Sequence, residues 1–313
     1  MNTIYGLRHL KRQAKGSVVT IGVFDGVHIG HRKVIKKAVD SAVKAKLASI
    51  VITFDPHPAK ILKSGRAAPS LISLKHRIRL IGELGADILL IVKFTKPFSK
   101  MPPEKFVENI LIDKLRMKEI YLGDNFSFGN GAAGRGARIL RDMSRGLGFK
   151  VTIIKPVKLN ARIVSSSLIR RLILSGNLRE AARLSGRPVS IFGTVVKGSG
   201  IARGLGCPTA NINPHHEAIP PKGVYAVRAR IGGKQFPGIV NIGFRPTFYS
   251  PRDKEPTVEA HIFDFRGNLY NRDIEVEFAS KIRDERKFRS SAALIRQIAR
   301  DMGAAIKILY KIT

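Results

Sequence analysis

Apolar runs of strand length alternate with segments of helical periodicity through the first half of this chain, and this alternation limits the possible folds more than any other feature. Residues 17–24 (SVVTIGVF) predict a buried strand, residues 31–47 carry apolar side chains at helical spacing, and residues 48–54 (ASIVITF) predict a second strand. Strands that alternate with helices are typical of a parallel, doubly wound α/β sheet, here of the Rossmann-like kind. The remaining predicted helices cover residues 73–84 and 102–116, and the remaining predicted strands cover residues 87–94, 119–123 and 150–157.

The pattern changes near residue 187. Two short helices are predicted at residues 166–175 and 177–184, and the segment SGRP then interrupts the chain. Beyond it, short runs with a period of two, such as GVYAVRARI and TVEAHIFDF, are separated by glycine, proline and asparagine. This pattern indicates an antiparallel β-barrel, and a final amphipathic helix is expected at about residues 291–308.

A chain of 313 residues is long for one compact core. Together with the change of pattern, the length predicts two domains, an α/β domain over residues 1–186 and a β-barrel domain over residues 187–313.

Nothing in the sequence suggests a membrane or an oxidising compartment. The longest uninterrupted aliphatic run, residues 88–92, is far shorter than the roughly 20 residues that cross a bilayer. Charged residues interrupt the N-terminal apolar residues before a signal-peptide core could form. The single cysteine, Cys207, excludes an internal disulfide and a multi-cysteine zinc site. We therefore expect a cytoplasmic protein with no membrane partner.

The charge balance is strongly basic, with 56 Lys and Arg against 23 Asp and Glu and a net charge of +33. Such a surplus attracts anions over a long range. One interpretation is a nucleic-acid-binding protein, and the other is a basic proteome or a solvated surface that serves phosphate substrates. The second is favoured because the basic residues are spread along the chain and no RNA-binding aromatic signature accompanies them.

A first phosphate site is indicated where the first predicted strand meets its helix, in the segment GVFDGVHIGH at residues 22–31. Ligands of open α/β sheets bind at the carboxyl ends of strands, where helix N-terminal amides meet a phosphate. His28 and His31 are three residues apart and can face the same side, and Gly26 and Gly30 let the backbone approach closely. Taken alone, the two histidines could also be a helix cap or a surface pair.

A second anion site is indicated at the start of the predicted helix near residue 166. Ser165, Ser166 and Arg170 place hydroxyl groups and a cation there, although an ordinary serine N-cap has the same appearance. A third segment, GTVVKGSGIARGLGCPTAN at residues 193–211, is a glycine-rich loop that suits close backbone approach to a nucleotide.

These motifs together resemble those of bacterial bifunctional riboflavin kinase/FAD synthetases. The His-x-Gly-His motif at residues 28–31 and the later serine-arginine motif resemble those of the nucleotidyltransferase superfamily. In the first half, the matching segments are GVFDGVHIGH, TFDPHP, GDNFSFG and VSSSLIR. In the second half they are PTAN, GVYAV, NIGFRPTF, TVEAHIFDF and KIRDERKF, which look like the riboflavin kinase module.

For the first domain, the resemblance implies FMN adenylyltransferase activity. The FMN phosphate attacks the α-phosphorus of ATP and pyrophosphate leaves, so catalysis consists of alignment and charge neutralisation. His28 and His31 would contact the ATP phosphates as catalytic residues, and Ser166 and Arg170 the leaving pyrophosphate. The implied ATP-binding residues are Gly22, Phe24, Asp25, Gly26, His28, Gly30, His31, Ser165, Ser166 and Arg170, and the implied flavin-binding residues are Asn125, Phe126, Phe128 and His57. The two phenylalanines could instead belong to the core, and His57 could be a turn residue.

For the second domain, the resemblance implies riboflavin kinase activity with ATP and Mg²⁺. Thr209 and Asn211 would hold the metal and the ATP phosphates, and Glu259 would accept the proton of the ribityl 5′-hydroxyl. The implied ATP-binding residues are Gly198, Gly200, Arg203, Gly206, Thr209 and Asn211. Glu259 could alternatively face solvent from its strand.

Three positions depart from the usual kinase pattern. Ala202 and Asn271 stand where glycine is usual, and Cys207 stands where phenylalanine precedes PTAN. Asparagine tolerates a left-handed backbone, whereas a methyl group at residue 202 could crowd the nucleotide. The sequence therefore leaves open an FAD synthetase whose kinase module is impaired.

Overall fold

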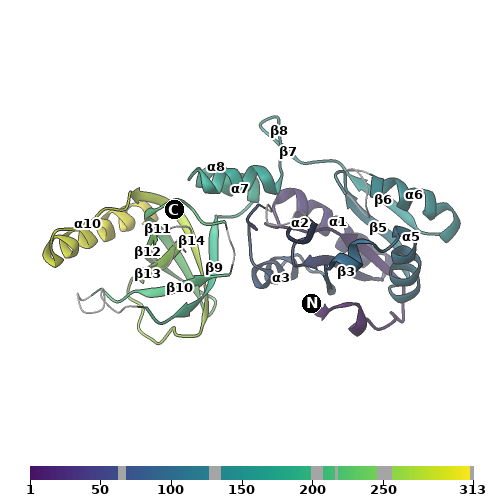
Figure 1. The fold of residues 1–313 in the computed structure, drawn as a ribbon, viewed down its shortest axis with the longest axis horizontal. Coiled ribbons are helices and arrows are strands. Elements are labelled where there is room, and N and C mark those ends of the chain that lie inside the picture. Colours follow the sequence, from purple (N-terminus) through teal and green to yellow (C-terminus); the bar gives the residue numbers. More distant parts are fainter. Residues whose placement is uncertain (63–67, 127–134, 199–206, 216–217, 245–255, 311–313) are drawn as a thin grey trace. The chain divides into compact units, whose positions relative to one another are not determined.

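The computed structural model describes residues 1–62, 68–126, 135–198, 207–215, 218–244 and 256–310 (Figure 1). Contacts divide the chain into two compact units. The first unit comprises Met1–Ser70 and Leu74–Ser166, and the second comprises Leu71–Ser73 and Ser167–Thr313. This division concerns packing, and the predicted boundary of the catalytic domains at residue 186 stays a prediction.

The first unit is built on a six-stranded parallel sheet with the order β1-β4-β3-β2-β5-β6. Its strands are β1 (Asn2–Tyr5), β2 (Ser17–Ile21), β3 (Ala48–Asp55), β4 (Ile88–Lys93), β5 (Met117–Gly123) and β6 (Lys150–Ile154). The strand order reverses between β2 and β5, and ligands bind at such a reversal in open α/β sheets. The predicted doubly wound α/β fold is confirmed.

Side chains on the two faces of β2 enter two different layers of the core. Val18 is buried against Ala38 and Ala42 of α1 (Ile29–Ala45). Val19 and Ile21 point into the larger cluster on the opposite face of the sheet. A strand that is buried on both faces appears in the sequence as a continuous apolar run. This explains why polar and apolar residues do not alternate over residues 17–24. The other helices of this unit are α2 (Pro58–Leu62), α3 (Leu74–Gly82), α4 (Lys96–Ser99), α5 (Pro103–Phe106) and α6 (Arg135–Leu147).

Several elements of this unit differ from the sequence predictions. The helix predicted at 102–116 begins as α5 and continues as a π-helix, Val107–Lys114, with Leu115 N–H donating to the Ile110 carbonyl at 2.9 Å. Strand β1 and helix α6 were not predicted. The β1 strand is a short edge strand without an apolar run, and α6 has a strongly charged outer face. Short elements that the sequence did not predict are the 3₁₀ turn at Leu7–His9, α2, α4 and the hairpin of β7 (Lys158–Leu159) and β8 (Arg162–Ile163).

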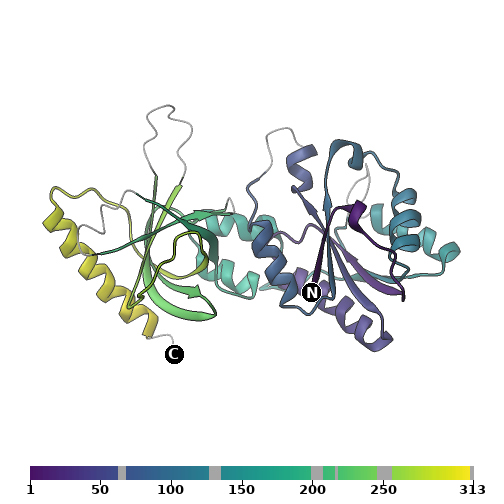
Figure 2. The same cartoon turned by 90° about the horizontal axis from the view of Figure 1, so that it is seen from below.

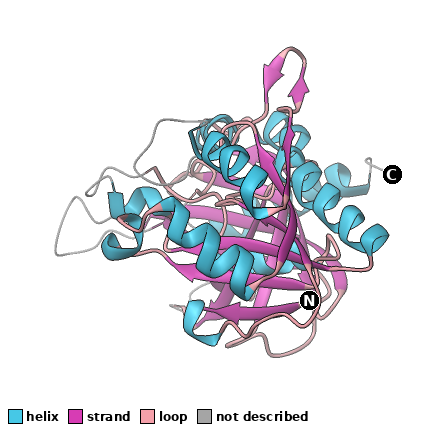
Figure 3. Cartoon of the chain, turned by 90° about the vertical axis from the view of Figure 1, so that its right-hand side faces the viewer, coloured by secondary structure: helices cyan, strands magenta, loops and turns pink. Residues whose placement is uncertain are grey.

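The second unit contains a closed antiparallel barrel with the strand order β10-β13-β12-β11-β14-β9, which confirms the predicted barrel (Figure 2). Its strands are β9 (Ser190–Val196), β10 (Ala210–Pro214), β11 (Gly223–Ile231), β12 (Lys234–Phe244), β13 (Pro256–Ile262) and β14 (Asp273–Arg283). Tyr225 is fully buried, and its hydroxyl donates to the Pro221 carbonyl at 2.6 Å. The helices of this unit are α7 (Ser166–Leu174), α8 (Leu178–Ser185) and α10 (Ser291–Tyr310), and α7 begins at the last residue of the first unit. Figure 3 distinguishes the helices from the strands.

Helix α10 is held on the barrel by apolar packing and by one buried ion pair. Ala305 and Leu309 pack against Val224 and related barrel residues. The Arg283 guanidinium at the end of β14 donates from Nε and Nη2 to the Asp301 carboxylate at 2.8–3.0 Å, and Asp301 is 2% exposed. None of the helices in the described part of the chain is long and apolar enough to span a bilayer.

Removal of the Asp301 carboxylate should weaken the attachment of α10. In Asp301→Ala the Arg283 guanidinium loses its buried counter-ion, which costs about 3 kcal/mol. We expect hydrogen exchange, followed by mass spectrometry, to lose a corresponding amount of protection in α10 and β14 peptides.

Asp264→Asn is the matched control, because Asp264 is exposed on the same unit and its positive φ of 55° suits asparagine. Equal protection of α10 in the two variants would show that the ion pair does not hold the helix.

Candidate functional site

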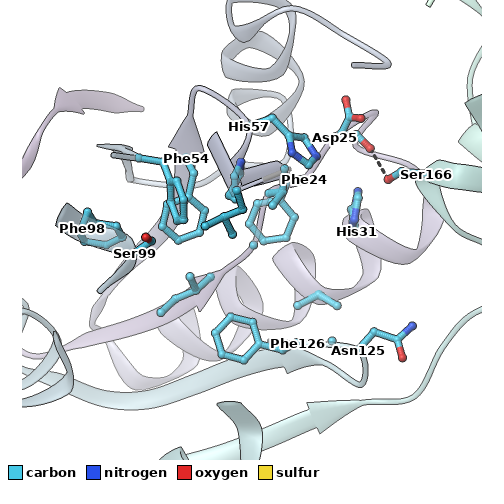
Figure 4. A pocket seen from close by; sticks show the side chains of 18 of the residues that line it. Phe24, Asp25, His31, Phe54, His57, Phe98, Ser99, Asn125, Phe126 and Ser166 are labelled. Carbon is cyan, nitrogen blue, oxygen red and sulfur yellow. Dashed lines mark hydrogen bonds between the residues drawn. The ribbon is translucent and has the colours of Figure 1, made fainter. Parts of the chain in front are cut away.

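A cavity of about 530 Å³ lies at the carboxyl ends of the parallel strands, where the strand order reverses. Residues that follow β2 and residues that follow β5 form two of its walls, and residues from the ends of β3 and β4 and from neighbouring helices complete the lining. In Figure 4 the polar residues Asp25, His31 and Ser166 lie together at one end of the cavity, and Phe54 and Phe98 lie at the other. Among the predicted residues, the cavity is lined by Gly22, Phe24, Asp25, His31, His57, Asn125, Phe126 and Ser166.

The turn between β2 and α1 has a backbone that few residues adopt. Phe24 has a φ of 50°, Gly26 of 87° and Val27 of 40°. Non-glycine residues are uncommon at positive φ, and a β-branched valine is an outlier there. Gly22 is also required, because a Cβ at this position would lie 2.8 Å from the Phe24 ring. Surrounding contacts must hold this conformation, and such strain is typical of ligand sites.

The two histidines of the motif pack face to face. Their ring centroids are 3.6 Å apart with an interplanar angle of 19°, and the Phe24 ring meets His31 edge-on at 5.4 Å. His28 is the N-cap of α1, and its Nδ1 accepts a hydrogen bond from the His31 amide at 3.3 Å. Only His31 lines the cavity, since His28 is 4% exposed. The hydrogen bond supports the cap interpretation for His28, while the cavity position supports a ligand contact for His31.

Gly30 keeps room for this stack, because a Cβ there would lie 3.2 Å from two His28 ring atoms. Gly26 adopts its positive φ in the preceding turn but does not line the cavity. Gly26 therefore permits the backbone conformation of the turn, and Gly30 leaves room for the His28 ring.

Both imidazoles are neutral at pH 7. Burial lowers the pKa of His28 to about 4, although a backbone hydrogen bond opposes this shift. Burial lowers the pKa of His31 well below its ordinary value, and the nearby charges of His28 and Arg77 lower it further. The His31 Nδ1 is buried and has no hydrogen-bond partner among the described residues. A buried nitrogen without a partner is destabilising on its own, which is consistent with a group that a ligand completes.

The serine motif at residues 164–170 reaches the β2–α1 turn through a hydrogen bond, although the two segments are far apart in the sequence. Ser166 Oγ donates a hydrogen bond to the Asp25 carbonyl at 2.8 Å, drawn as the dashed line in Figure 4. Ser165 directly precedes α7 and is half-buried. Arg170 lies one turn further along α7, within the second compact unit. The sequence motifs at residues 22–31 and 164–170 are therefore in contact through Ser166, although they are far apart in the chain.

The other end of the cavity is aromatic. Asn125 and Phe126 follow β5, and Phe126 also packs against the main core cluster. The rings of Phe54, Phe94 and Phe98 meet at centroid distances between 5.7 and 6.2 Å. His57 lines the cavity from the turn after β3, and its Nδ1 accepts from the Ala59 amide at 3.1 Å. Phe128 lies outside the described residues.

A second cavity, of about 700 Å³, lies in the barrel unit. Thr209, Asn211 and Gly198 line it. A Cβ at Gly198 would lie 2.0 Å from the Asn211 side-chain nitrogen, so glycine is needed for the asparagine to occupy its place. The predicted residues Gly200, Arg203 and Gly206, and the unusual Ala202, lie outside the described residues.

Glu259 lies opposite Asn211 in the register of β10 and β13, and opposite Asn241 in that of β13 and β12. Residues paired in this way share a face of the sheet. Glu259 is half-buried between the fully buried Val258 and Ala260, and it does not line the 700 Å³ cavity. The structure thus places Glu259 beside Asn211 on one face of the sheet, where the Glu259 side chain is partly exposed to solvent.

Two of the unusual kinase positions can be described. Asn271 has a φ of 61°, the left-handed conformation that asparagine tolerates. Cys207 is half-buried and is not part of a disulfide.

Arg77 was not identified from the sequence and lies directly behind the first cavity. Its guanidinium Nη1 donates to the carbonyls of Val23 at 2.8 Å and Phe54 at 3.0 Å. Arg77 lies on the same helix face as the buried Leu80 and Ile81. A charged residue on the apolar face of a predicted helix was the signal that could have revealed it.

Comparison with known proteins identifies a family for each half of the chain. The FAD synthetase family model matches residues 10–168, and the riboflavin kinase family model matches residues 185–309. The chain belongs to the bifunctional riboflavin kinase/FMN adenylyltransferase family. A family member from Buchnera aphidicola is 38% identical over 96% of this chain and 97% of its own. Another, from Bacillus subtilis, is 35% identical over 95% of this chain and 94% of its own.

A solved structure of the same size also matches. The crystal structure of a Streptococcus pneumoniae protein named as a macrolide-efflux protein is 28% identical. It superimposes with a TM-score of 0.81 and covers 97% of this chain and 99% of its own. The likeness shows that the same fold extends over nearly the whole chain.

The buried imidazoles predict a loss of stability in acid. An unfolded histidine is protonated below about pH 6.5, whereas folded His28 stays neutral until about pH 4. The contribution of His28 to stability is therefore independent of pH above pH 7, decreases as the pH falls from 6.5 to 4, and is lower by about 3 kcal/mol in total. Urea unfolding of the wild type and of His28→Asn, measured at several pH values, should show a smaller acid loss in the variant.

Asparagine retains a capping acceptor, so the variant isolates the titration from the cap. His9→Asn, at an exposed position of the same unit, should keep the wild-type pH dependence. An unchanged acid loss in His28→Asn would contradict a neutral His28 in the folded protein.

Proposed function

We propose that this chain phosphorylates riboflavin with ATP to give FMN, and then transfers AMP from ATP to FMN to give FAD and pyrophosphate. The observation that carries the proposal is the presence of both family modules, each of which contains a cavity lined by residues of its own motif. The domains assigned to these activities are residues 1–186 for adenylyl transfer and 187–313 for the kinase, in a cytoplasmic protein.

Adenylyl transfer needs no protein nucleophile. An oxygen of the FMN phosphate forms a bond to the α-phosphorus of ATP, and the bond to the β-phosphate oxygen breaks, so that pyrophosphate leaves with its electron pair. The site must align the two phosphates and neutralise charge. At the polar end of the cavity, the neutral His31 ring would contribute a hydrogen bond and the amides at the start of α1 a partial positive charge. Ser166 fixes the turn through its bond to Asp25.

His28 acts with His31, because its stacked ring and its cap bond hold the second imidazole in place. Arg170 is assigned to pyrophosphate by the family motif alone. The ATP-binding roles of Gly22, Phe24, Gly26 and Gly30 are assigned to the backbone of the β2–α1 turn and the start of α1, and that of Ser165 to the segment directly before α7.

The flavin ring system is proposed to occupy the aromatic end of the first cavity. Phe126 and Asn125 line the same cavity from the segment after β5, and an aromatic ring with one amide suits a planar heterocycle that both stacks and hydrogen-bonds. The His57 ring lines the same cavity.

Phosphorylation of riboflavin is assigned to the barrel. Glu259 would orient the ribityl 5′-hydroxyl and take its proton as the oxygen attacks the γ-phosphorus of ATP, with ADP leaving. The Thr209 hydroxyl and the Asn211 amide oxygen are hard oxygen ligands that line one cavity, where Gly198 makes room for the Asn211 side chain, so they fit Mg²⁺. The bound metal would neutralise phosphate charge.

The two activities should separate by mutation. We expect His31→Ala to reduce FAD formation from FMN about 100-fold while FMN formation from riboflavin is retained. Glu259→Gln should reduce FMN formation about 100-fold or more while FAD is still made from supplied FMN. Chromatography of the flavins after incubation with ATP and Mg²⁺ measures both.

His9→Ala and Glu277→Gln are the matched controls in the two units, and both should retain both activities. Absence of FMN and FAD with the wild type would overturn the proposed function. Formation of FAD from FMN, but of no FMN from riboflavin, would instead indicate an FAD synthetase with an impaired kinase module, the alternative that Cys207 and Ala202 raise.

Phe126 provides a test of the flavin end alone. In Phe126→Leu the loss of an aromatic contact of about 1 kcal/mol should raise the KM for FMN about fivefold, with little change in the KM for ATP. Steady-state kinetics at saturating concentrations of the other substrate measures the two constants. An equal rise in both would place Phe126 in the core and not against the flavin.

A further inference from the structure

Arg77 is a buried cation behind the wall of the adenylyl-transfer cavity. It lies on α3 and is 5% exposed, and it does not itself line the cavity. Its neighbours Val23 and Phe54 do line the cavity, and they follow or end two adjacent strands, β2 and β3. The guanidinium therefore connects the two strands from behind.

The contacts of Arg77 converge on the strained turn. Nη1 donates to the Val23 carbonyl at 2.8 Å, and also lies 3.0 Å from Thr53 Oγ1. Thr53 Oγ1 donates to the same Val23 carbonyl at 3.0 Å. The next residue is Phe24, which has the positive φ of 50°. Two donors thus fix the peptide that precedes the left-handed residue.

The second strand is fixed by the same group. Nη1 donates to the Phe54 carbonyl at 3.0 Å, and Nη2 lies 4.0 Å from the Asp55 carboxylate. A planar guanidinium can reach several acceptors in one plane, which an ammonium group cannot reproduce. Because both strand ends carry residues of the cavity wall, a change at Arg77 moves both sides of the site.

We propose that Arg77 is a positioning residue for adenylyl transfer, which holds the β2–α1 turn and the end of β3 in the geometry that aligns the two phosphates. The inference rests on the proposed function of this cavity. Arg77 acts through Val23, Thr53 and Phe54, and it does not contact the substrates.

The charge of Arg77 also reaches the histidine pair. Burial lowers the pKa of Arg77, and the Asp25 and Asp55 carboxylates oppose this. Burial, His28 and Arg77 together lower the pKa of His31. The charged and titratable groups that act on His31 are thus His28, the N-cap of its own helix, and Arg77 on α3, while Asp25 in the turn acts on Arg77. Removal of the Arg77 charge raises the pKa of His31, so the imidazole is protonated at a higher pH.

The test compares Arg77→Met with Arg77→Lys in the full chain. We expect Arg77→Met to reduce kcat for FAD formation from FMN about 100-fold, because misalignment by about 1 Å has an effect of this size. The KM for FMN should change less than threefold. Arg77→Lys should restore part of kcat, and the acid limb of the kcat profile should move to higher pH in Arg77→Met but not in Arg77→Lys.

Thr53→Val provides an independent variant that keeps the side-chain volume. It removes one of the two donors to the Val23 carbonyl, so kcat should fall about 10-fold with the pH profile unchanged. Because the two residues share this acceptor, the double variant should lose less than the product of the two single effects.

Lys75→Met is the matched control, since it removes one cation from an exposed position of the same helix. Retained phosphorylation of riboflavin by each variant shows that its barrel unit is folded. A wild type that makes no FAD from FMN would contradict the proposed function itself. A wild type that makes FAD, with Arg77→Met and Lys75→Met equal in kcat and pH profile, would overturn only the role of Arg77.

Discussion

The turn between β2 and α1 is the constraint on which the first site depends. Its backbone passes through positive φ at Phe24, Gly26 and Val27, and this path brings the start of α1 to the edge of the sheet with His31 facing the cavity. Local preference opposes such a conformation in a non-glycine residue. The turn therefore depends on contacts from elsewhere in the chain, namely the hydrogen bonds to the Val23 and Asp25 carbonyls.

The same packing sets the protonation of the site. Two imidazoles stacked at 3.6 Å cannot both carry charge without strong repulsion, and their burial removes the water that would solvate that charge. The burial that keeps both rings neutral beside a helix N-terminus therefore also lowers the stability of the folded protein in acid. A neutral imidazole donates from one nitrogen, and the amides at the start of α1 add the positive potential that phosphates require.

The sequence predicted those features that local pattern determines. The strand 17–24, its helix and the His28 and His31 pair follow from apolar runs and spacing, and the barrel follows from period-two runs. The sequence patterns did not predict features that depend on tertiary contacts. Strand β1 exists because it pairs with β4, the π-helix at Val107–Lys114 has the same apolar spacing as an α-helix, and Arg77 became important through carbonyls 23 residues or more away. Likewise, the register that places Glu259 opposite Asn211 depends on how the barrel closes.

The central claim is that one chain uses two different phosphorus atoms of ATP at two separate sites. The most direct measurement supplies riboflavin with ATP labelled at the γ-phosphorus in one reaction and at the α-phosphorus in another, and then isolates FAD. FAD should carry label in both reactions, in its FMN phosphate from the γ position and in its AMP phosphate from the α position. FAD that takes label from the α position alone, or no labelled FAD in either reaction, would contradict it.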